Sequence, residues 1–329
     1  PPRLGGLDMM LPIYQEMKLH SDVFIEVIFL NKEVMSQIKK DNYLNYQLLN
    51  TVDRITVIEL KIGFKSIAAI FKTIKGIFGL LFLTLRIILY KKNPILLHAA
   101  NLNSRFIQLL NWLTKRKNGL TIGHFKLMGG GKLLDEKEGG RLLPVSSNTS
   151  DSSKFSAKNN IVNELYGDYF AIFNKDNVES WDIESKKRCI EIGYTRVYKS
   201  WIDKLKNDSI HHRNNSTWFP DFKGKSPFSL IYLPSTLKNV FDEDELENWL
   251  MEVIPILSQQ LPDNPIILKP HPLQKMNHLR RVLSKMNNIN CLVSFVHPGL
   301  LAAQAQVVIS HHSTTIIDAM ALNVPVIHH

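Results

Sequence analysis

Two histidines and three hydroxyl residues follow directly on an apolar run near the end of the chain. Residues 307–310 predict a buried strand, and 314–322 predict the helix that comes after it. Backbone N–H groups, hydroxyls and imidazoles at such a junction can bind an anion together, and Asp318, one turn into the helix, can accept from a ribose hydroxyl. The candidate ligands are His311, His312, Ser313, Thr314 and Thr315. An ordinary capped helix, with Ser313 or Thr314 as the N-cap, is the alternative.

Basic and imidazole side chains stand at the ends of two further predicted strands. Lys269 ends the strand predicted over 265–269, and His271 follows between two prolines that stiffen the exit. A Lys–His pair can neutralise a phosphate and protonate a leaving group, which makes His271 a candidate catalytic residue as well. His297 closes the next strand, predicted over 290–295. Since ligands gather at the carboxyl ends of parallel strands, these strand ends predict a phosphate-binding site.

The first half of the chain offers acidic candidates for a general base. Gly129–Lys132 is a glycine-rich segment whose backbone can approach a sugar or phosphate closely. Asp135 and Glu138 come just after it, and Asp8 comes just after a Gly-Gly turn at 5–6. A transfer that activates an acceptor hydroxyl needs a carboxylate or a histidine as its base. Asp8, Asp135 and Glu138 are therefore the candidates, and a solvated charged loop at 129–138 is the alternative.

The elements that must position these residues alternate between strand and helix. Apolar runs in the first half predict strands at 23–29, 55–60, 94–99, 120–125, 169–173 and 189–193. The second half predicts strands at 229–233, 265–269, 290–295, 307–310 and 325–327, and a helix with an acidic first turn at 242–261. The spacing predicts an α/β fold of two Rossmann-like, doubly wound domains, over 1–210 and 225–329. The chain stops in a strand-like run, so we expect the second domain to be incomplete at its C-terminus.

The composition bounds the class of protein and the kind of partner. At 329 residues, with 44% hydrophobic and 21% charged residues, the chain suits two globular domains. Two distant cysteines, Cys189 and Cys291, indicate neither a disulfide framework nor a zinc site. A formal charge of +10 calls for an anionic partner. Nucleic acid is disfavoured, because the basic residues are not interleaved with stacking aromatics and no nucleic-acid-binding motif is present.

Residues 61–92 form an apolar and basic stretch that predicts a long amphipathic helix. Five basic residues fall at helical spacings on one side, namely Lys61, Lys65, Lys72, Lys75 and Arg86. The most apolar part, 76–85, is shorter than the roughly 18 to 20 residues of a membrane span. A helix lying on an anionic bilayer fits this pattern. A buried crossover helix with its lysines in solvent is the alternative.

The second half of the chain also resembles a known family. The strand-terminal Lys269-Pro270-His271-Pro272, the later Ser/Thr-rich helix start with its acid, and an Asn-x-Pro-Val-Ile strand at 323–327 resemble the C-terminal domain of GT-B glycosyltransferases. The likeness is to bacterial capsule and surface-polysaccharide enzymes, including Kdo transferases and CDP-glycerol glycerophosphotransferases. It implies two Rossmann-like domains with the active site in the cleft between them. It implies that His271, Ser313 and Thr314 bind the nucleotide phosphates and that Asp318 contacts the ribose or nucleotide.

From this resemblance we expect a metal-independent glycosyltransferase that uses a CMP-, CDP- or UDP-activated donor and no other cofactor. The basic helix leads us to expect a protein bound peripherally to the inner face of the cytoplasmic membrane. There it would transfer the sugar to a glycan or lipid-linked acceptor. Three alternatives stay open. They are a non-hydrolysing UDP-sugar 2-epimerase, a CDP-glycerol-type glycerophosphotransferase, and a non-catalytic nucleotide-binding scaffold.

Overall fold

The fold is known from a computed structural model that describes residues 5–29, 32–58, 67–89, 94–99, 105–124, 133–135, 141–143, 168–174, 183–211, 227–234, 242–271, 274–286, 289–311, 313 and 315–328. Its contacts divide the chain into two compact units. The first unit joins residues 1–28 and 33–56 to residues 196–329, and the second contains 29–32 and 57–195. The N-terminal helices thus group with the C-terminal sheet, which differs from a simple division into 1–210 and 225–329.

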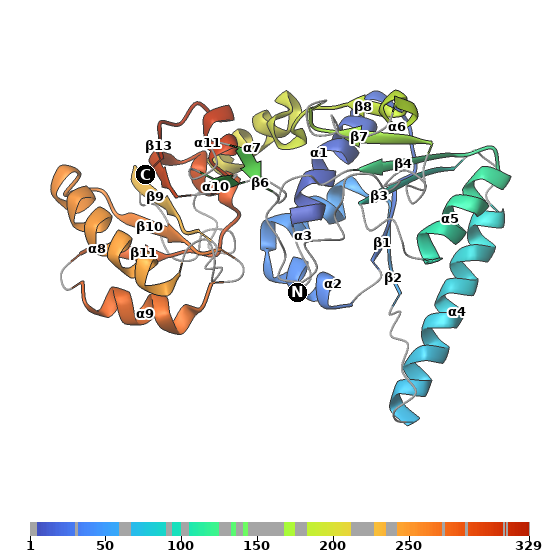
Figure 1. Ribbon diagram of the computed structural model, residues 1–329, viewed down its shortest axis with the longest axis horizontal. Helices are drawn as coiled ribbons and strands as arrows, with labels where there is room; N and C mark the ends of the chain where they lie inside the picture. The colour runs from blue at the N-terminus through green and yellow to red at the C-terminus, as the bar shows by residue number, and fades with distance from the viewer. Residues whose placement is uncertain are drawn as a thin grey trace. The chain divides into compact units, whose positions relative to one another are not determined.

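The first unit is built on a parallel sheet with the strand order of a Rossmann fold (Figure 1). Its strands are β9 (Phe228–Tyr232), β10 (Ile266–Lys269), β11 (Cys291–Val293), β12 (Ala305–Ser310) and β13 (Val326–His328). They lie in the order β11-β10-β9-β12-β13, and every neighbouring pair is parallel. All five residues of β9 are buried, as expected for a strand with covered faces. The five strands predicted for the second half are confirmed.

The helices between these strands are α8 (Glu243–Gln260), α9 (Met276–Ser284), α10 (Pro298–Ala302) and α11 (Ile316–Ala321). The helix predicted over 242–261 is confirmed, with Asp242 as its N-cap and Leu261 as its C-cap. Its inner face packs on the sheet through buried residues that include Leu246, Leu250 and Ile254. Each such side chain contributes about 1.5–3 kcal/mol by leaving water. This core holds the strand ends in a fixed arrangement.

Four helices outside this sheet complete the first unit. They are α1 (Gly5–His20), α2 (Lys32–Lys40), α3 (Asn42–Thr51) and α7 (Lys199–His211), and the short 3-10 helix η4 (Thr195–Val197) precedes α7. Helix α1 packs against α3 and α7, and α7 packs against α10. The sequence analysis missed α2, α3 and α7. The reason is that α7 is polar overall and buries a narrow stripe of Trp201, Ile202, Leu205 and Ser209.

The second unit is built on a four-stranded parallel sheet. Its strands are β3 (Ile95–Ala99), β4 (Leu120–His124), β7 (Tyr169–Ile172) and β8 (Cys189–Glu191), in the order β3-β4-β7-β8. Helix α5 (Arg105–Arg116) lies between β3 and β4 in the chain, and α6 (Ile183–Lys187) precedes β8. Two small ladders lie outside the two larger sheets: β5 (Leu133–Asp135) pairs with β6 (Arg141–Leu143) in this unit, and β1 (Glu26–Phe29) pairs with β2 (Arg54–Val57), which belong mainly to the first unit. The predicted strands of the first half are thus confirmed, with shorter bounds.

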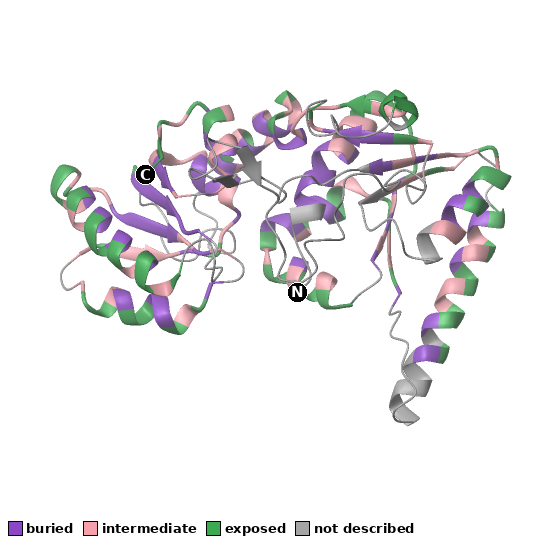
Figure 2. Ribbon diagram, viewed as in Figure 1, coloured by how far each residue is buried: buried purple, intermediate pink, exposed green. Residues whose placement is uncertain are grey.

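The predicted basic helix is confirmed as α4 (Ile67–Leu89). Exposed and buried residues alternate along it (Figure 2). Its inner side is formed by Thr73, Gly76, Leu83 and Ile87. A side-chain carbon on Gly79 would lie 3.4 Å from buried Ile58, so the helix lies close over the residue that follows β2. Of the helices that the structure describes, none combines the length and apolar character that crossing a membrane requires.

Candidate functional site

The candidate site lies where the strand order of the first unit reverses. Chain order runs outward in one direction from β9 through β10 to β11, and in the other from β12 to β13. Lys269 of β10 and Ser310 of β12 both pair with Tyr232 of β9, so the three strands end at one level. In open α/β sheets, the crevice outside the carboxyl ends of the strands at such a reversal is the place where ligands bind. The sequence-predicted residues Lys269 and His311 are thereby brought to one edge.

Lys269 is half-buried at this edge and keeps part of its hydrogen-bonding capacity. Its Nζ donates to the carbonyl oxygen of Phe295 at 3.3 Å. Burial lowers the pKa of Lys269, while the carboxylates of Asp41 and Asp8 act in the opposite direction. An ammonium group has three donors, so a single long contact to a carbonyl leaves capacity for an anionic ligand. A phosphate in the crevice would compensate the charge that burial disfavours.

His271 lies two residues beyond Lys269, and its environment favours the neutral imidazole. Burial is the larger cause that lowers its pKa, and the positive charge of Lys269 is the second. The backbone N–H of Gln274 donates to the carbonyl oxygen of His271 at 2.8 Å. A neutral imidazole presents one donor and one acceptor nitrogen. His271 can therefore hydrogen-bond a phosphate or a leaving group without adding a second charge next to Lys269.

The end of β12 carries the second group of predicted ligands. The ring of His311 lies edge-on to Trp249 of α8, with 5.8 Å between ring centroids, and 6.5 Å from the ring of His328. The Ser313 Oγ and Thr315 Oγ1 atoms are hydrogen-bonded at 2.6 Å. The N-cap of α11 is Thr315, so the cap predicted at Ser313 or Thr314 falls later in the chain. His312 and Thr314 lie outside the described residues.

Asp318 and Asp8 belong to a buried cluster around Arg196 of η4. The guanidinium of Arg196 pairs through Nη1 with Asp8 Oδ2 at 3.2 Å and through Nη2 with Asp318 Oδ2. All three side chains are less than a tenth exposed. A guanidinium is the cation suited to two carboxylates at once, because its donors form a rigid planar fork. Arg196 therefore ties α1 to α11 inside the first unit.

Sequence reasoning missed Arg196 as a site residue. A signal existed in the sequence: a basic residue stands in the short segment 192–198, between the last strand of the first half and the next helix. Periodicity could not predict the partners of Arg196, because Asp8 lies 188 positions earlier and Asp318 lies 122 positions later in the chain. The roles predicted for Asp8 as a base and for Asp318 as a ribose contact stay predictions. In this structure each carboxylate is bound by Arg196.

His297 joins the same cluster and has a defined tautomer. The backbone N–H of Gly299 donates to Nδ1 at 3.2 Å, so His297 caps α10, and Nε2 lies 3.0 Å from Asp8 Oδ1. Because Nδ1 accepts, the proton sits on Nε2 and is donated to the Asp8 carboxylate. The ring also lies 5.1 Å from the ring of Tyr43. Both nitrogens of His297 thus have protein partners, which suits a residue that positions Asp8. Its predicted contact with a nucleotide stays a prediction.

The remaining acidic candidates cannot be placed in the same way. Asp135 ends β5, where its backbone pairs in register with Arg141 of β6. The description of Asp135 is limited to its backbone, and Glu138 lies outside the described residues. Their predicted role as a general base is therefore untested.

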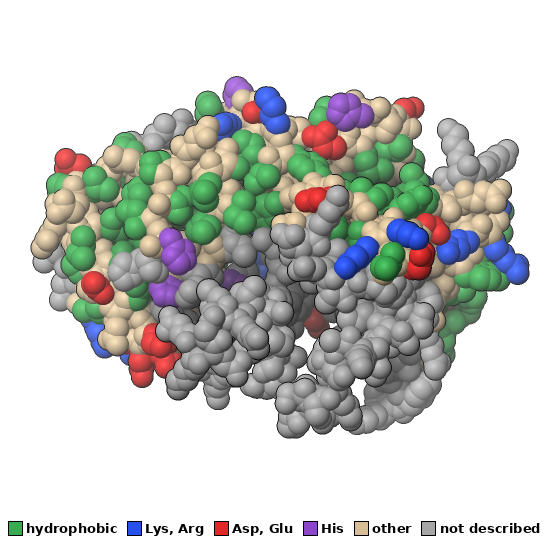
Figure 3. Space-filling view, turned by 45° about the horizontal axis from the view of Figure 1, so that its top comes forward, with side chains coloured by type: hydrophobic (Ala, Val, Ile, Leu, Met, Phe, Trp, Pro, Cys, Tyr) green, Lys and Arg blue, Asp and Glu red, His purple; other side chains and the backbone are tan. Residues whose placement is uncertain are grey.

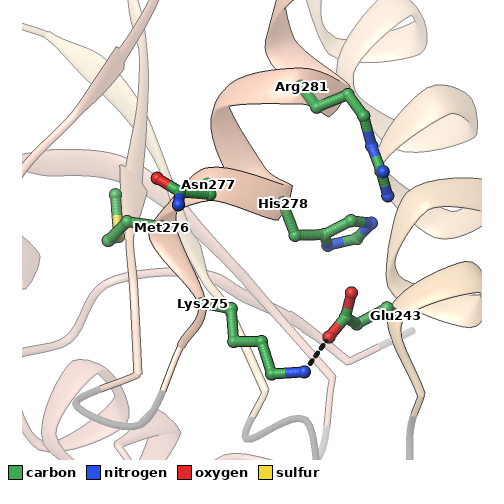
Figure 4. A pocket seen from close by; sticks show the side chains of 6 residues that line it. All are labelled: Glu243, Lys275, Met276, Asn277, His278 and Arg281. Carbon is green, nitrogen blue, oxygen red and sulfur yellow. Dashed lines mark hydrogen bonds and ion pairs between the residues drawn. The ribbon is translucent and has the colours of Figure 1, made fainter.

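A hollow of about 500 Å³ opens beside the N-terminal turns of α8 and α9 (Figure 4). Its lining consists of Glu243, Lys275, Met276, Asn277, His278 and Arg281. Lys275 Nζ and Glu243 Oε1 form an ion pair at 2.5 Å across it. As described, its lining includes none of the sequence-predicted site residues. Paired surface charges of this kind are ordinary, and each pair contributes about 0–1 kcal/mol to stability.

The start of α8 contains a sequence that resembles a metal-binding motif. Asp242-Glu243-Asp244 has the Asp-x-Asp spacing that can hold a divalent cation. Asp242 Oδ1 instead accepts from the backbone N–H groups of Asp244 and Glu245 at 2.9 and 2.8 Å, and Glu245 Oε2 accepts from the N–H of Asp242 at 2.7 Å. This is a capping box. Within the part of the chain that the structure describes, no group of three or more His, Cys, Asp or Glu is placed to hold a metal ion.

Comparison with known proteins gives a fold but no family. No family model and no curated protein matches the sequence. Among solved structures, UDP-GlcNAc 2-epimerase from Methanocaldococcus jannaschii, in complex with UDP-GlcNAc and UDP, aligns with a TM-score of 0.54 and 14% identity, over 98% of this chain and 80% of that one. UDP-GlcNAc 2-epimerase from Neisseria meningitidis, bound to UDP-GlcNAc, gives a TM-score of 0.51 and 13% identity, over 99% and 80%. The wall teichoic acid polymerase TagF aligns with a TM-score of 0.49 and 13% identity, over 96% of this chain and 65% of that one.

The epimerases have the GT-B architecture, so the predicted fold class, two Rossmann-like α/β domains of GT-B type, is confirmed. At 13–14% identity the likeness shows the fold and leaves the activity open.

Proposed function

We propose that this chain is a nucleotide-sugar-dependent enzyme, and specifically a glycosyltransferase that builds a cell-surface polysaccharide or glycolipid at a membrane. The observation that carries the proposal is the common level of Lys269 and Ser310 against Tyr232. It brings a partly buried ammonium group, two imidazoles and a pair of hydrogen-bonded hydroxyls to the carboxyl edge of a sheet with Rossmann strand order. Nucleotides bind in that position in folds of this order.

The residues at this edge suit the stabilisation of a departing nucleotide phosphate. Lys269 supplies positive charge in a partly desolvated place, where it counts for more than in water. Neutral His271 can donate a hydrogen bond to the phosphate or to the bridging oxygen as the glycosidic bond breaks. Ser313 and Thr315 add hydroxyl donors once the hydrogen bond between them is exchanged for one to the ligand. The donor is proposed to be a CMP-, CDP- or UDP-activated sugar.

We propose that one of three residues is the base that activates the acceptor hydroxyl, namely Asp8, Asp135 or Glu138. In the present arrangement Asp8 is bound by Arg196 and by His297, and it is buried. A carboxylate with its oxygens so engaged is a weak proton acceptor. Asp8 would have to exchange one of these partners for the acceptor before acting, whereas a role in positioning His297 and Arg196 needs no such change.

A second candidate function is epimerisation of a UDP-sugar, since two UDP-GlcNAc 2-epimerases align with nearly the whole chain. Both functions need a nucleotide-sugar site. The transferase also needs an acceptor, whereas the epimerase needs none. A CDP-glycerol-type transferase shares that site as well, and a non-catalytic scaffold would retain binding alone.

One experiment separates these functions. The protein is incubated with UDP-GlcNAc and with a panel of UDP-, GDP-, CDP- and CMP-activated donors, with and without a lipid-linked glycan extract, and the released nucleotide and the sugar products are measured. Nucleotide release that depends on the acceptor supports the transferase. Conversion of a UDP-sugar to its 2-epimer without an acceptor would replace the transferase by the epimerase. Nucleotide binding without turnover of any donor would leave the scaffold.

A further inference from the structure

All of the net positive charge of the chain is confined to one segment of the second unit. Residues 60–134 contain 13 Lys and Arg residues and no Asp or Glu. The rest of the chain has 27 basic and 30 acidic residues, a net charge of −3, although the whole carries +10. On the face of the molecule drawn in Figure 3, acidic and basic side chains of the described residues lie in mixed groups. This segment of 75 residues without a carboxylate thus accounts for the positive charge of the whole chain.

Helix α4 lies in this segment and carries a broad apolar face that points to solvent. Eight of its large apolar residues are exposed, namely Ile74, Ile77, Phe78, Leu81, Phe82, Leu85, Ile88 and Leu89. At 100° per residue these positions fall within an arc of about 140°. The exposure reaches 67% at Phe78 and 61% at Phe82. Scattered exposed apolar side chains are ordinary, but a continuous face of this kind marks an interaction surface.

The opposite face of α4 is already used. Leu83 and Ile87 are buried, and α5, with its own buried Leu110 and Leu113, packs beside α4. One side of the helix thus packs on its unit, and exposed residues recur along its length (Figure 2). This geometry differs from the alternative of a buried crossover helix with its lysines in solvent, because large apolar residues of α4 are exposed as well.

Basic residues flank the apolar face on one side. The helix positions of Lys72, Lys75 and Arg86 fall within an arc of about 60° next to the apolar arc, between it and the buried face. The guanidinium of Arg86 lies over the ring of Phe82, 5.7 Å from its centroid. An apolar face with an adjoining basic flank is the pattern of helices that lie in the headgroup region of an anionic membrane.

We propose that the apolar face of α4 inserts into the surface of an anionic lipid bilayer, with its basic flank on the lipid headgroups. The charge distribution argues for lipid as the occupant. A second copy of this segment would bring 13 positive charges against 13 others, whereas an anionic bilayer complements them. This proposal rests on the proposed function in one respect: membrane binding would give the enzyme access to a lipid-linked acceptor.

Vesicle co-sedimentation with the full chain tests this surface. Vesicles of phosphatidylcholine alone are compared with vesicles that contain about 30% phosphatidylglycerol, at about 0.1 M and 1 M salt. We expect the wild-type protein to bind the anionic vesicles at low salt and to bind the neutral ones much more weakly. No binding to anionic vesicles at low salt would overturn the proposal.

Two variants, each with a matched control, assign the binding to α4. Phe78→Ser/Phe82→Ser/Leu85→Ser should weaken binding by about 1,000-fold or more, since each of the three inserted apolar side chains counts for about tenfold or more. The control Leu19→Ser/Ile210→Ser/Ile256→Ser changes three exposed apolar residues of the first unit and should bind as wild type. Lys72→Gln/Lys75→Gln should lose about 30-fold at low salt, and Lys186→Gln/Lys187→Gln on α6 should not. Undiminished binding by either α4 variant would contradict the assignment.

Two further measurements keep this result separate from the proposed function. The α4 triple variant should retain nucleotide binding in solution, and Lys269→Met should retain vesicle binding. If light scattering shows a wild-type dimer that becomes a monomer in the triple variant, and vesicles recruit neither, a second copy covers the face and the lipid proposal is wrong.

Discussion

The Asp8 carboxylate of α1 lies 3.0 Å from Nε2 of His297, a residue 289 positions later in the chain. The same carboxylate pairs with Arg196 at 3.2 Å, and Arg196 also pairs with Asp318. Three segments that are remote in sequence are therefore held together by charges that are almost fully buried. Because breaking a buried pair leaves an uncompensated charge, this cluster makes specific demands on its members.

Asp8→Asn should destabilise the first unit while keeping the shape of the side chain. The amide removes the charge that Arg196 and His297 face, and we expect a loss of about 2–4 kcal/mol in the free energy of unfolding. Urea unfolding measures this loss. The control is Asp203→Asn on α7, whose exposed pair with Lys199 should contribute less than about 0.5 kcal/mol. Equal stability of Asp8→Asn and wild type would mean that the cluster does not hold α1.

Arg196→Met should lower the free energy of unfolding by about 3–5 kcal/mol relative to wild type, because two buried carboxylates lose their cation. This loss is larger than the one expected for Asp8→Asn. The loss in Arg196→Met should depend on pH. Without the guanidinium, burial raises the pKa of these carboxyl groups in the folded state above the unfolded value. Protonation then stabilises the folded state, so the deficit should shrink as pH falls and grow as pH rises. Unfolding curves over a pH series measure it, and a deficit independent of pH would contradict this reasoning.

Lys269→Met should separate nucleotide binding from stability. We expect affinity for the nucleotide to fall by about 30-fold or more, since a buried charged contact to phosphate is lost. The stability should stay equal or rise, because a desolvated cation is removed. Calorimetric titration and thermal unfolding measure the two effects. Lys275→Met, in the hollow beside α9, is the control and should leave nucleotide affinity unchanged.

The lowered pKa of Lys269 also sets the direction of a pH effect in the free protein. The charged form exists below this pKa, so nucleotide affinity should fall as pH rises, from a pH below the usual lysine range near 10.5. Over the interval between the lowered pKa and the unfolded value, the unfolded state binds more protons, so wild-type stability should increase with pH. Lys269→Met should lack both trends. Persistence of the affinity trend in this variant would assign it to another group.

His271→Ala should abolish donor turnover and leave folding intact, because the imidazole lies at the strand end rather than in the core. Its pKa is lowered, so the neutral form persists at mildly acidic pH, and turnover should decline only as acid protonates it. His271→Gln should recover part of the activity, as an amide can still donate and accept. His20, an exposed residue on α1, serves as the control, and His20→Ala should turn over donor like wild type.

Local signals account for what the sequence predicted well. The helix over 242–261 carries its own cap and an acidic first turn, and the five strands of its sheet are short buried runs bounded by polar residues. Local signals do not determine the strand order. Strand β12 lies beside β9 because it pairs with residues about 80 positions earlier in the chain. Periodicity predicts a strand without predicting its neighbour, so the common level of Lys269 and Ser310 came from the structure.

The candidate site was predicted in part for the same reason. His271 and Lys269 stand next to a strand end that the sequence marks with two prolines. The partners of His297, Asp8 and Asp318 are set by tertiary packing of α1, α7, α10 and α11, and no local pattern encodes them. Helix α7 could have been recognised from the spacing of Trp201, Ile202, Leu205 and Ser209, which recurs on one helical face.

Calorimetric titration of the wild-type chain with UDP, CDP, GDP and CMP, repeated with Lys269→Met, tests the nucleotide site most directly. We expect at least one of these nucleotides to bind the wild-type protein, and the same nucleotide to bind Lys269→Met about 30-fold or more weakly. Binding that is unaffected by Lys269→Met, or the failure of all four nucleotides to bind the folded wild-type protein, would contradict the account.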